Sequence, residues 1–110
     1  MRQLMIDDLS PQERDNLEHY LKRTLGAGPI DGMFWLRLPD DLLGEAQQGH
    51  AACGPFHFGI ELGRAHLSFE LLIRNAANLH CSCIAYATKA QRDYLFRYID
   101  EMLAEEQIRA

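Results

Sequence analysis

The sequence predicts an α+β fold, a two-layer sandwich in which an antiparallel sheet of three to four strands carries helices on one face. Apolar and polar residues alternate over 56–62 and again over 66–73, and turn residues separate these segments, which indicates an antiparallel meander over 56–86. Apolar residues recur at helical spacing near both ends of the chain. The predicted order is α-β-α-β-β-β-α within a single globular domain, residues 1–110.

The first helix begins at Ser10–Glu13, where serine and glutamate can form a capping box and proline occupies the tolerated first turn. Leu17, Leu21 and Leu25 lie on its apolar stripe. Gly26 then ends the helix as a C-terminal cap.

A strand over Met33–Leu38 follows, with two alternating sets of side chains. The inner set is Phe34, Leu36 and Leu38, and the outer set is Met33, Trp35 and Arg37. Pro39 closes the strand, and the aspartates after it predict a short helix over Asp40–Gln48, which Gly44 weakens. The pattern leaves open which strand lies beside it in the sheet and in which direction it runs.

Gly63 and Arg64 predict a two-residue type II′ hairpin turn, because glycine takes a positive φ there without a steric clash. The inner pairs of this register are Ile60 opposite Leu67 and Phe58 opposite Phe69, and its outer pairs are Glu61 opposite His66 and His57 opposite Glu70. A slip of one residue would set apolar residues against polar ones. The pattern therefore specifies this register, with the inner pairs facing the core.

The third strand of the meander is predicted over Leu79–Tyr86, with both cysteines on the inner face. The expected pairs are Leu71 with Cys81, Phe69 with Cys83 and Leu67 with Ala85. The last helix starts with a second capping box at Thr88–Gln91. Its buried stripe comprises Tyr94, Leu95, Tyr98, Ile99, Met102 and Leu103.

Composition limits the classes of partner. The net charge of −5 and the scattered placement of the 11 lysines and arginines predict no nucleic-acid partner. No apolar run reaches the ~20 residues that a membrane helix needs, which predicts no membrane partner. The first residues lack the features of a signal peptide, and three cysteines form no disulfide framework, so we expect a cytoplasmic location.

Four potential soft ligands stand at His50, Cys53, Cys81 and Cys83, the number that a zinc site needs. On a straight strand, however, the two residues Cys81 and Cys83 lie roughly 6.5 Å apart, whereas zinc knuckles use tight turns. The sequence therefore predicts no metal and no cofactor, and a metal-binding regulator remains an alternative.

Two residue pairs could support catalysis in a small hydrolase or isomerase. Cys53 lies near His50 in the sequence, and His57 is expected opposite Glu70. Cys53 follows a predicted helix and so lacks the helix N-terminus that would lower its pKa. No catalytic residue is assigned, and a non-enzymatic function is favoured.

The outer face of the sheet is the predicted site of partner binding, because apolar residues stand there among polar ones. The residues assigned to it are Trp35, His57, Glu61, His66, Glu70, Leu72 and His80. The sequence thus predicts a small acidic protein that acts through protein–protein contact, as a homodimer joined through this face or through an edge strand. In size, acidity and mixed α/β pattern it is similar to small secretion chaperones, although it shares no motif with them.

Overall fold

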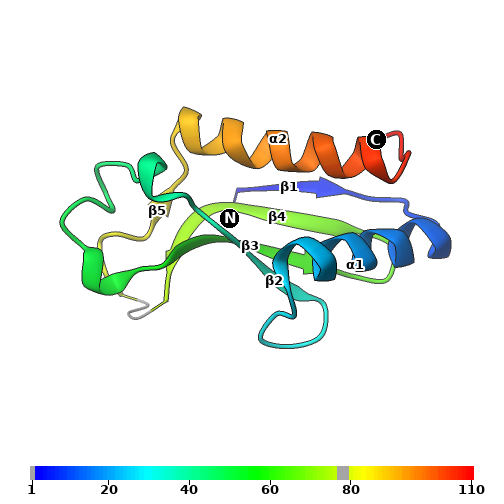
Figure 1. Ribbon diagram of the computed structural model, residues 1–110, viewed down its shortest axis with the longest axis horizontal. Helices are drawn as coiled ribbons and strands as arrows, with labels where there is room; N and C mark the ends of the chain where they lie inside the picture. Colours follow the sequence, from blue (N-terminus) through cyan, green and yellow to red (C-terminus); the bar gives the residue numbers. More distant parts are fainter. Residues whose placement is uncertain (1, 77–79) are drawn as a thin grey trace.

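The computed structural model describes residues 2–76 and 80–110, and it confirms the α+β fold with an antiparallel sheet. Its strands are β1 (Gln3–Ile6), β2 (Met33–Arg37), β3 (Phe56–Leu62), β4 (Leu67–Asn75) and β5 (Ala85–Tyr86), and its helices are α1 (Pro11–Leu25) and α2 (Lys89–Glu105). The strand order is β1-β4-β3-β2, and β5 also pairs with β4, beyond the end of β1 (Figure 1). Two short 3₁₀ turns, η1 (Asp40–Leu42) and η2 (Ala51–Cys53), lie between β2 and β3.

Both helices begin at the predicted capping boxes. The Ser10 hydroxyl accepts a hydrogen bond from the Glu13 backbone N–H at 3.1 Å, and the Glu13 carboxylate accepts one from the Ser10 N–H at 2.9 Å. Thr88 and Gln91 make the same reciprocal pair at the start of α2. Gly26 caps the end of α1 with a φ of 81°, a conformation that favours glycine.

One apolar cluster fills the space between the inner face of the sheet and the two helices. Its fully buried members include Leu17 and Leu21 of α1, Phe58, Leu67, Phe69 and Ile73 of the sheet, and Leu95 and Met102 of α2. The helices contact each other directly, since the rings of Tyr20 and Tyr98 meet edge to face at 5.8 Å between centroids. Among the described residues, no helix is long and apolar enough to cross a membrane.

The hairpin between β3 and β4 has a longer turn than the sequence predicted. Four residues, Gly63–His66, form it, and the Gly63 N–H donates to the His66 carbonyl at 2.8 Å. Ile60 therefore lies opposite Phe69, and Glu61 opposite Ser68. The predicted register is wrong by two residues, but a shift of two keeps each side chain on its face, so the predicted inner set is still buried.

An irregularity in the pairing of β3 with β4 changes the register again. Phe58 lies opposite Ile73, and only Gly59 of β3 stands against the β4 segment 70–72. His57 consequently faces Arg74 across the strands, and not Glu70 as predicted. Such bulges redirect side chains at one place in a sheet.

The predicted third strand of the meander is wrong over most of its length. Only Ala85–Tyr86 forms a strand, and it pairs with Leu72 and Ile73, whereas Cys81–Cys83 lies in a turn region. The expected pairs of Cys81 and Cys83 are therefore absent from the described sheet. The place beside residues 67–70 is taken by β1, a strand that the sequence analysis missed.

The segment predicted as a helix over Asp40–Gln48 forms only the 3₁₀ turn η1 followed by further turns. Gly44 weakens helical propensity here, and the side-chain oxygen of Gln47 accepts a hydrogen bond from the Gly44 N–H at 3.0 Å. A side chain that binds the local backbone in this way competes with the helical hydrogen bonds. The observed order is β-α-β-β-β-β-α.

Candidate metal centre and the outer face of the sheet

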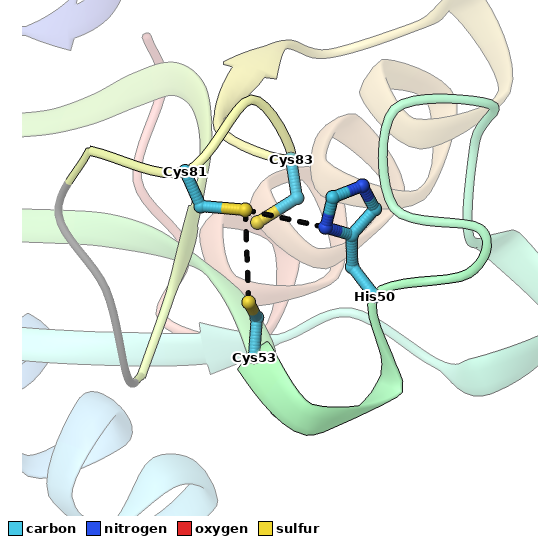
Figure 2. A group of neighbouring side chains, drawn as sticks. All are labelled: His50, Cys53, Cys81 and Cys83. Carbon is cyan, nitrogen blue, oxygen red and sulfur yellow. Dashed lines mark hydrogen bonds between the residues drawn. The ribbon is translucent and has the colours of Figure 1, made fainter.

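Four side chains converge at one end of the sheet, and we call them the His–Cys cluster: His50, Cys53, Cys81 and Cys83 (Figure 2). One nitrogen and three sulfur atoms all lie within 4.8 Å of one another. The Cys53 and Cys81 sulfurs are 3.6 Å apart, and the Cys81 sulfur is 3.2 Å from Nδ1 of His50. The four donor atoms thus surround a common point.

Two tight turns produce this convergence. In η2 the Cys53 N–H donates to the His50 carbonyl at 2.9 Å, and this turn brings the side chains of His50 and Cys53 to the same side. In the second turn the Ile84 N–H donates to the Cys81 carbonyl at 3.1 Å. The sequence argument against a metal assumed a straight strand at Cys81 and Cys83, and that assumption is wrong.

The distances fit a tetrahedral zinc site. With zinc–sulfur bonds of about 2.3 Å, the corners of a tetrahedron lie about 3.8 Å apart. The measured separations of 3.6 and 3.2 Å, with all donors inside 4.8 Å, require only small movements to reach that geometry. Three cysteines with one histidine are also among the donor sets of structural zinc sites.

Buried polar residues form a hydrogen-bond network that reaches the cluster at Cys83. The Asn75 amide donates to the Cys83 sulfur at 3.1 Å, and the Gln47 amide donates to the Cys83 carbonyl at 2.8 Å. The Gln91 amide in turn donates to the Gln47 side-chain oxygen at 3.1 Å and to the Leu42 carbonyl at 2.9 Å. Gln47, Asn75 and Gln91 are the buried polar residues of the described chain, and all three belong to this network. Hydrogen bonds of this kind orient metal ligands and are a regular part of metal sites.

The thiols of the cluster differ in acidity. The backbone N–H of Cys83 is the main cause that lowers the pKa of Cys81 to about 7, and the Cys83 and Cys53 side chains and His50 act in the same direction. A hydrogen bond to Cys81, followed by burial, raises the pKa of Cys53 to about 11. Cys81 is therefore the more readily ionised of these two thiols, and its thiolate is stabilised by its neighbours.

Neither predicted catalytic pair is formed as expected. Glu70 directs both carboxylate oxygens to Arg74, each at 2.8 Å, instead of orienting His57. The raised pKa of Cys53 disfavours the thiolate that a nucleophile needs, and the His50 ring contacts the Cys81 sulfur at 3.2 Å.

The outer face of the sheet carries a hollow of about 570 Å³, which we call the outer-face hollow. Four of the residues predicted for partner binding line it: Trp35, His57, Glu61 and Glu70. The other three lie outside its lining. His66 sits in the hairpin turn 3.9 Å from Glu61, Leu72 pairs with Tyr86 of β5, and His80 is exposed before the cysteine turn.

Gly59 and Arg74 are among the residues of the hollow that were not predicted for partner binding. Arg74 lay beyond the predicted end of its strand at residue 73, and Gly59 carried no chemical signal. An interruption of the alternation at Gly59 was the available hint, since a glycine inside a strand often marks a bulge or a close approach.

In comparisons with known proteins, no family model, curated protein or solved structure matches this chain. The function must therefore be argued from the site itself. The homodimer stays a prediction.

Proposed function

We propose that this protein is a small zinc-binding domain, in which His50, Cys53, Cys81 and Cys83 hold one structural zinc ion. The observation that supports it is the convergence of one imidazole nitrogen and three thiol sulfurs within 4.8 Å, supplied by two separate tight turns. Soft thiolate ligands in a tetrahedral arrangement favour zinc over calcium, magnesium or manganese.

The proposed role of the ion is structural and not catalytic. Four protein ligands complete the tetrahedral shell of zinc, whereas catalytic zinc sites keep one position open for water or substrate. Zinc binding displaces the protons of the three thiols, so that three thiolates and one neutral imidazole surround the ion. This agrees with the non-enzymatic function that the sequence favours.

The ion would join two segments that have little other regular structure. His50 and Cys53 belong to the connection between β2 and β3, and Cys81 and Cys83 precede β5, a strand of only two residues. A bridge from residue 53 to residue 81 closes a long loop, and such a constraint lowers the entropy of the unfolded chain. The proposal also fits a cytoplasmic location, where the thiols stay reduced and available as ligands.

Zinc loading is tested by elemental analysis of the full chain purified without added metal, followed by titration of the metal-free protein with Co²⁺. We expect one equivalent of zinc and, with cobalt, the visible absorption of a tetrahedral thiolate site. His50→Ala and Cys83→Ser should each lower the affinity, whereas His19→Ala, an exposed change on α1, should leave it unaltered. A stoichiometry well below one, with no cobalt spectrum, would overturn the proposal.

Zinc removal should also lower the free energy of unfolding. A ligand at 100 times its dissociation constant stabilises the folded state by about 2.7 kcal/mol. Denaturant unfolding with buffered zinc and with a chelator measures this difference. An equal stability in both conditions would show that no metal binds the folded state preferentially.

A further inference from the structure

We propose that the outer-face hollow binds a small aromatic carboxylic acid, with its ring against Trp35 and its carboxylate toward Arg37 and His57. This inference goes beyond the zinc centre and does not depend on it. It follows from three features of the hollow: its floor, its apolar wall and its row of basic residues.

Gly59, which has no side chain, lies in the floor of the hollow. A Cβ at Gly59 would lie 2.2 Å from a carboxylate oxygen of Glu70 and 3.3 Å from the Trp35 ring. The absence of a Cβ thus lets the Glu70 carboxylate and the Trp35 ring lie close against the backbone of residue 59, and both side chains line the hollow. The volume of about 570 Å³ falls within the range of about 300–1,000 Å³ that is typical of small-molecule sites.

The wall of the hollow offers a flat apolar surface. Trp35 packs against the His57 ring with 4.2 Å between centroids, which fixes the orientation of the indole, and Met33 and Pro55 also line the space. Aromatic rings prefer offset or tilted contacts with other rings. A planar aromatic group is therefore the apolar body that this wall suits.

Three basic residues that line the hollow form a row across the sheet. Arg37, His57 and Arg74 stand opposite one another on β2, β3 and β4. Arg74 is fixed by its two bonds to Glu70, whereas among residues 2–76 and 80–110 the partner of Arg37 is the exposed Asp40, at a long 3.7 Å. Arg37 can therefore turn toward an incoming carboxylate without losing a strong partner.

His57 completes the anion site as a neutral hydrogen-bond partner. Burial is the main cause that lowers its pKa, the charge of Arg74 acts in the same direction, and Glu70 opposes both. A neutral imidazole can still donate one hydrogen bond to a carboxylate oxygen.

The charges that line the hollow disfavour a ligand with two negative charges. Two arginines and two glutamates line the hollow, so their formal charges cancel when His57 is neutral. A phosphate dianion would add its repulsion from Glu61 and Glu70, whereas one carboxylate can pair with Arg37. The hollow therefore fits a monocarboxylic acid better than a phosphorylated ligand.

The test uses 2-naphthoate as the probe and 2-naphthamide as its neutral counterpart, added to the zinc-supplemented full chain. Trp35 is the single tryptophan, so its indole N–H gives one NMR signal that reports directly on the hollow. We expect naphthoate to shift this signal and the side-chain signals of Arg37 and Arg74. The amide should bind at least about tenfold more weakly, since it lacks the charge that the arginine recognises.

Two variants and a dilution series make the outcome decisive. Arg37→Gln should weaken naphthoate binding at least about fivefold, whereas Arg64→Gln, an exposed change in the hairpin turn, should not alter it. Gly59→Ala should weaken the shift of the Trp35 signal, because its Cβ would displace the Glu70 carboxylate and crowd the Trp35 ring. Absence of binding, equal binding of acid and amide, or insensitivity to Arg37→Gln would overturn the proposal. A Trp35 signal that moves on protein dilution alone would also overturn it, because a second copy would then occupy the hollow.

Discussion

The two halves of β4 are held in place by different forces. Its first half, residues 67–70, lies between β1 and β3, and Leu67 and Phe69 are fully buried among apolar side chains. Its second half lies beside the two-residue strand β5 and ends at Asn75, which donates to the Cys83 sulfur. One strand therefore joins an apolar end of the molecule to a polar, thiol-rich end.

The two ends should therefore respond differently to substitution. At the apolar end the stabilisation is spread over many contacts, each of them small. At the thiol-rich end it is concentrated in a few directional bonds of Gln47, Asn75 and Gln91, where the loss of one partner leaves another buried group unsatisfied. Three substitutions test these responses and differ in the size of the effect that we expect.

Phe69→Ala tests the apolar end and should have the largest effect. Phe69 is fully buried and lies opposite both Leu4 and Ile60, so its removal leaves a cavity at the centre of the sheet. We expect a loss of about 3–5 kcal/mol in the free energy of unfolding, measured with a chemical denaturant. Phe96→Ala is the matched control, because Phe96 of α2 is only half-buried. This substitution should lower the free energy of unfolding by less than half as much as Phe69→Ala does. Equal losses would mean that burial does not set the contribution at this end.

Gln47→Met tests the thiol-rich end. It removes the amide that donates to the Cys83 carbonyl and the oxygen that accepts from the Gly44 N–H and the Gln91 amide. The side chain keeps a similar length. We expect a loss of about 1–3 kcal/mol in the free energy of unfolding. Amide hydrogen exchange should increase more around Cys83 than around Phe69. The neighbouring exposed residue provides the control, Gln48→Met, for which little change is expected. A uniform increase in exchange over both ends would remove the distinction between them.

His57→Gln should give the smallest effect, seen only in the pH dependence of stability. The pKa of His57 is lowered in the folded state by burial and by Arg74, against the opposing charge of Glu70, so the unfolded chain binds more protons. Stability from this group is present above about pH 6.5 and is lost as the pH falls toward the folded pKa.

The measurement compares wild type and His57→Gln by denaturant unfolding at about pH 7.5 and about pH 5.5, the range in which histidine titrates. The variant should lose less stability on acidification than the wild type does. His19→Gln, on the exposed side of α1, should behave as the wild type. A steeper loss in His57→Gln would contradict the direction of the pKa shift.

The comparison of the two ends also explains what the sequence could predict. Alternation identified the buried faces of β2, β3 and the first half of β4 because it depends only on which side each residue faces. It could not distinguish a two-residue turn from the observed four-residue turn at Gly63–His66, since a shift of two preserves every face. β1 was missed because four residues with only partial burial give little periodic signal.

The His–Cys cluster was present in the sequence analysis but rejected on geometry. The alternation around Cys81 and Cys83 predicts a strand, and on a straight strand the two sulfurs could not converge on one ion. The turn that brings them together depends on hydrogen bonds from Gln47 and Asn75, residues distant in sequence. Such long-range polar contacts leave no local pattern from which the turn could be predicted.

The position of Gln91 gives α2 two unequal ends. Gln91 takes part in the capping box of the helix and also bonds to Gln47, whose amide reaches the Cys83 carbonyl. An ordinary helix loosens from both termini. Here the N-terminal turn of α2 is fastened by hydrogen bonds that also reach the His–Cys cluster, so we expect loss of the proposed zinc ion to loosen α2 at this end first.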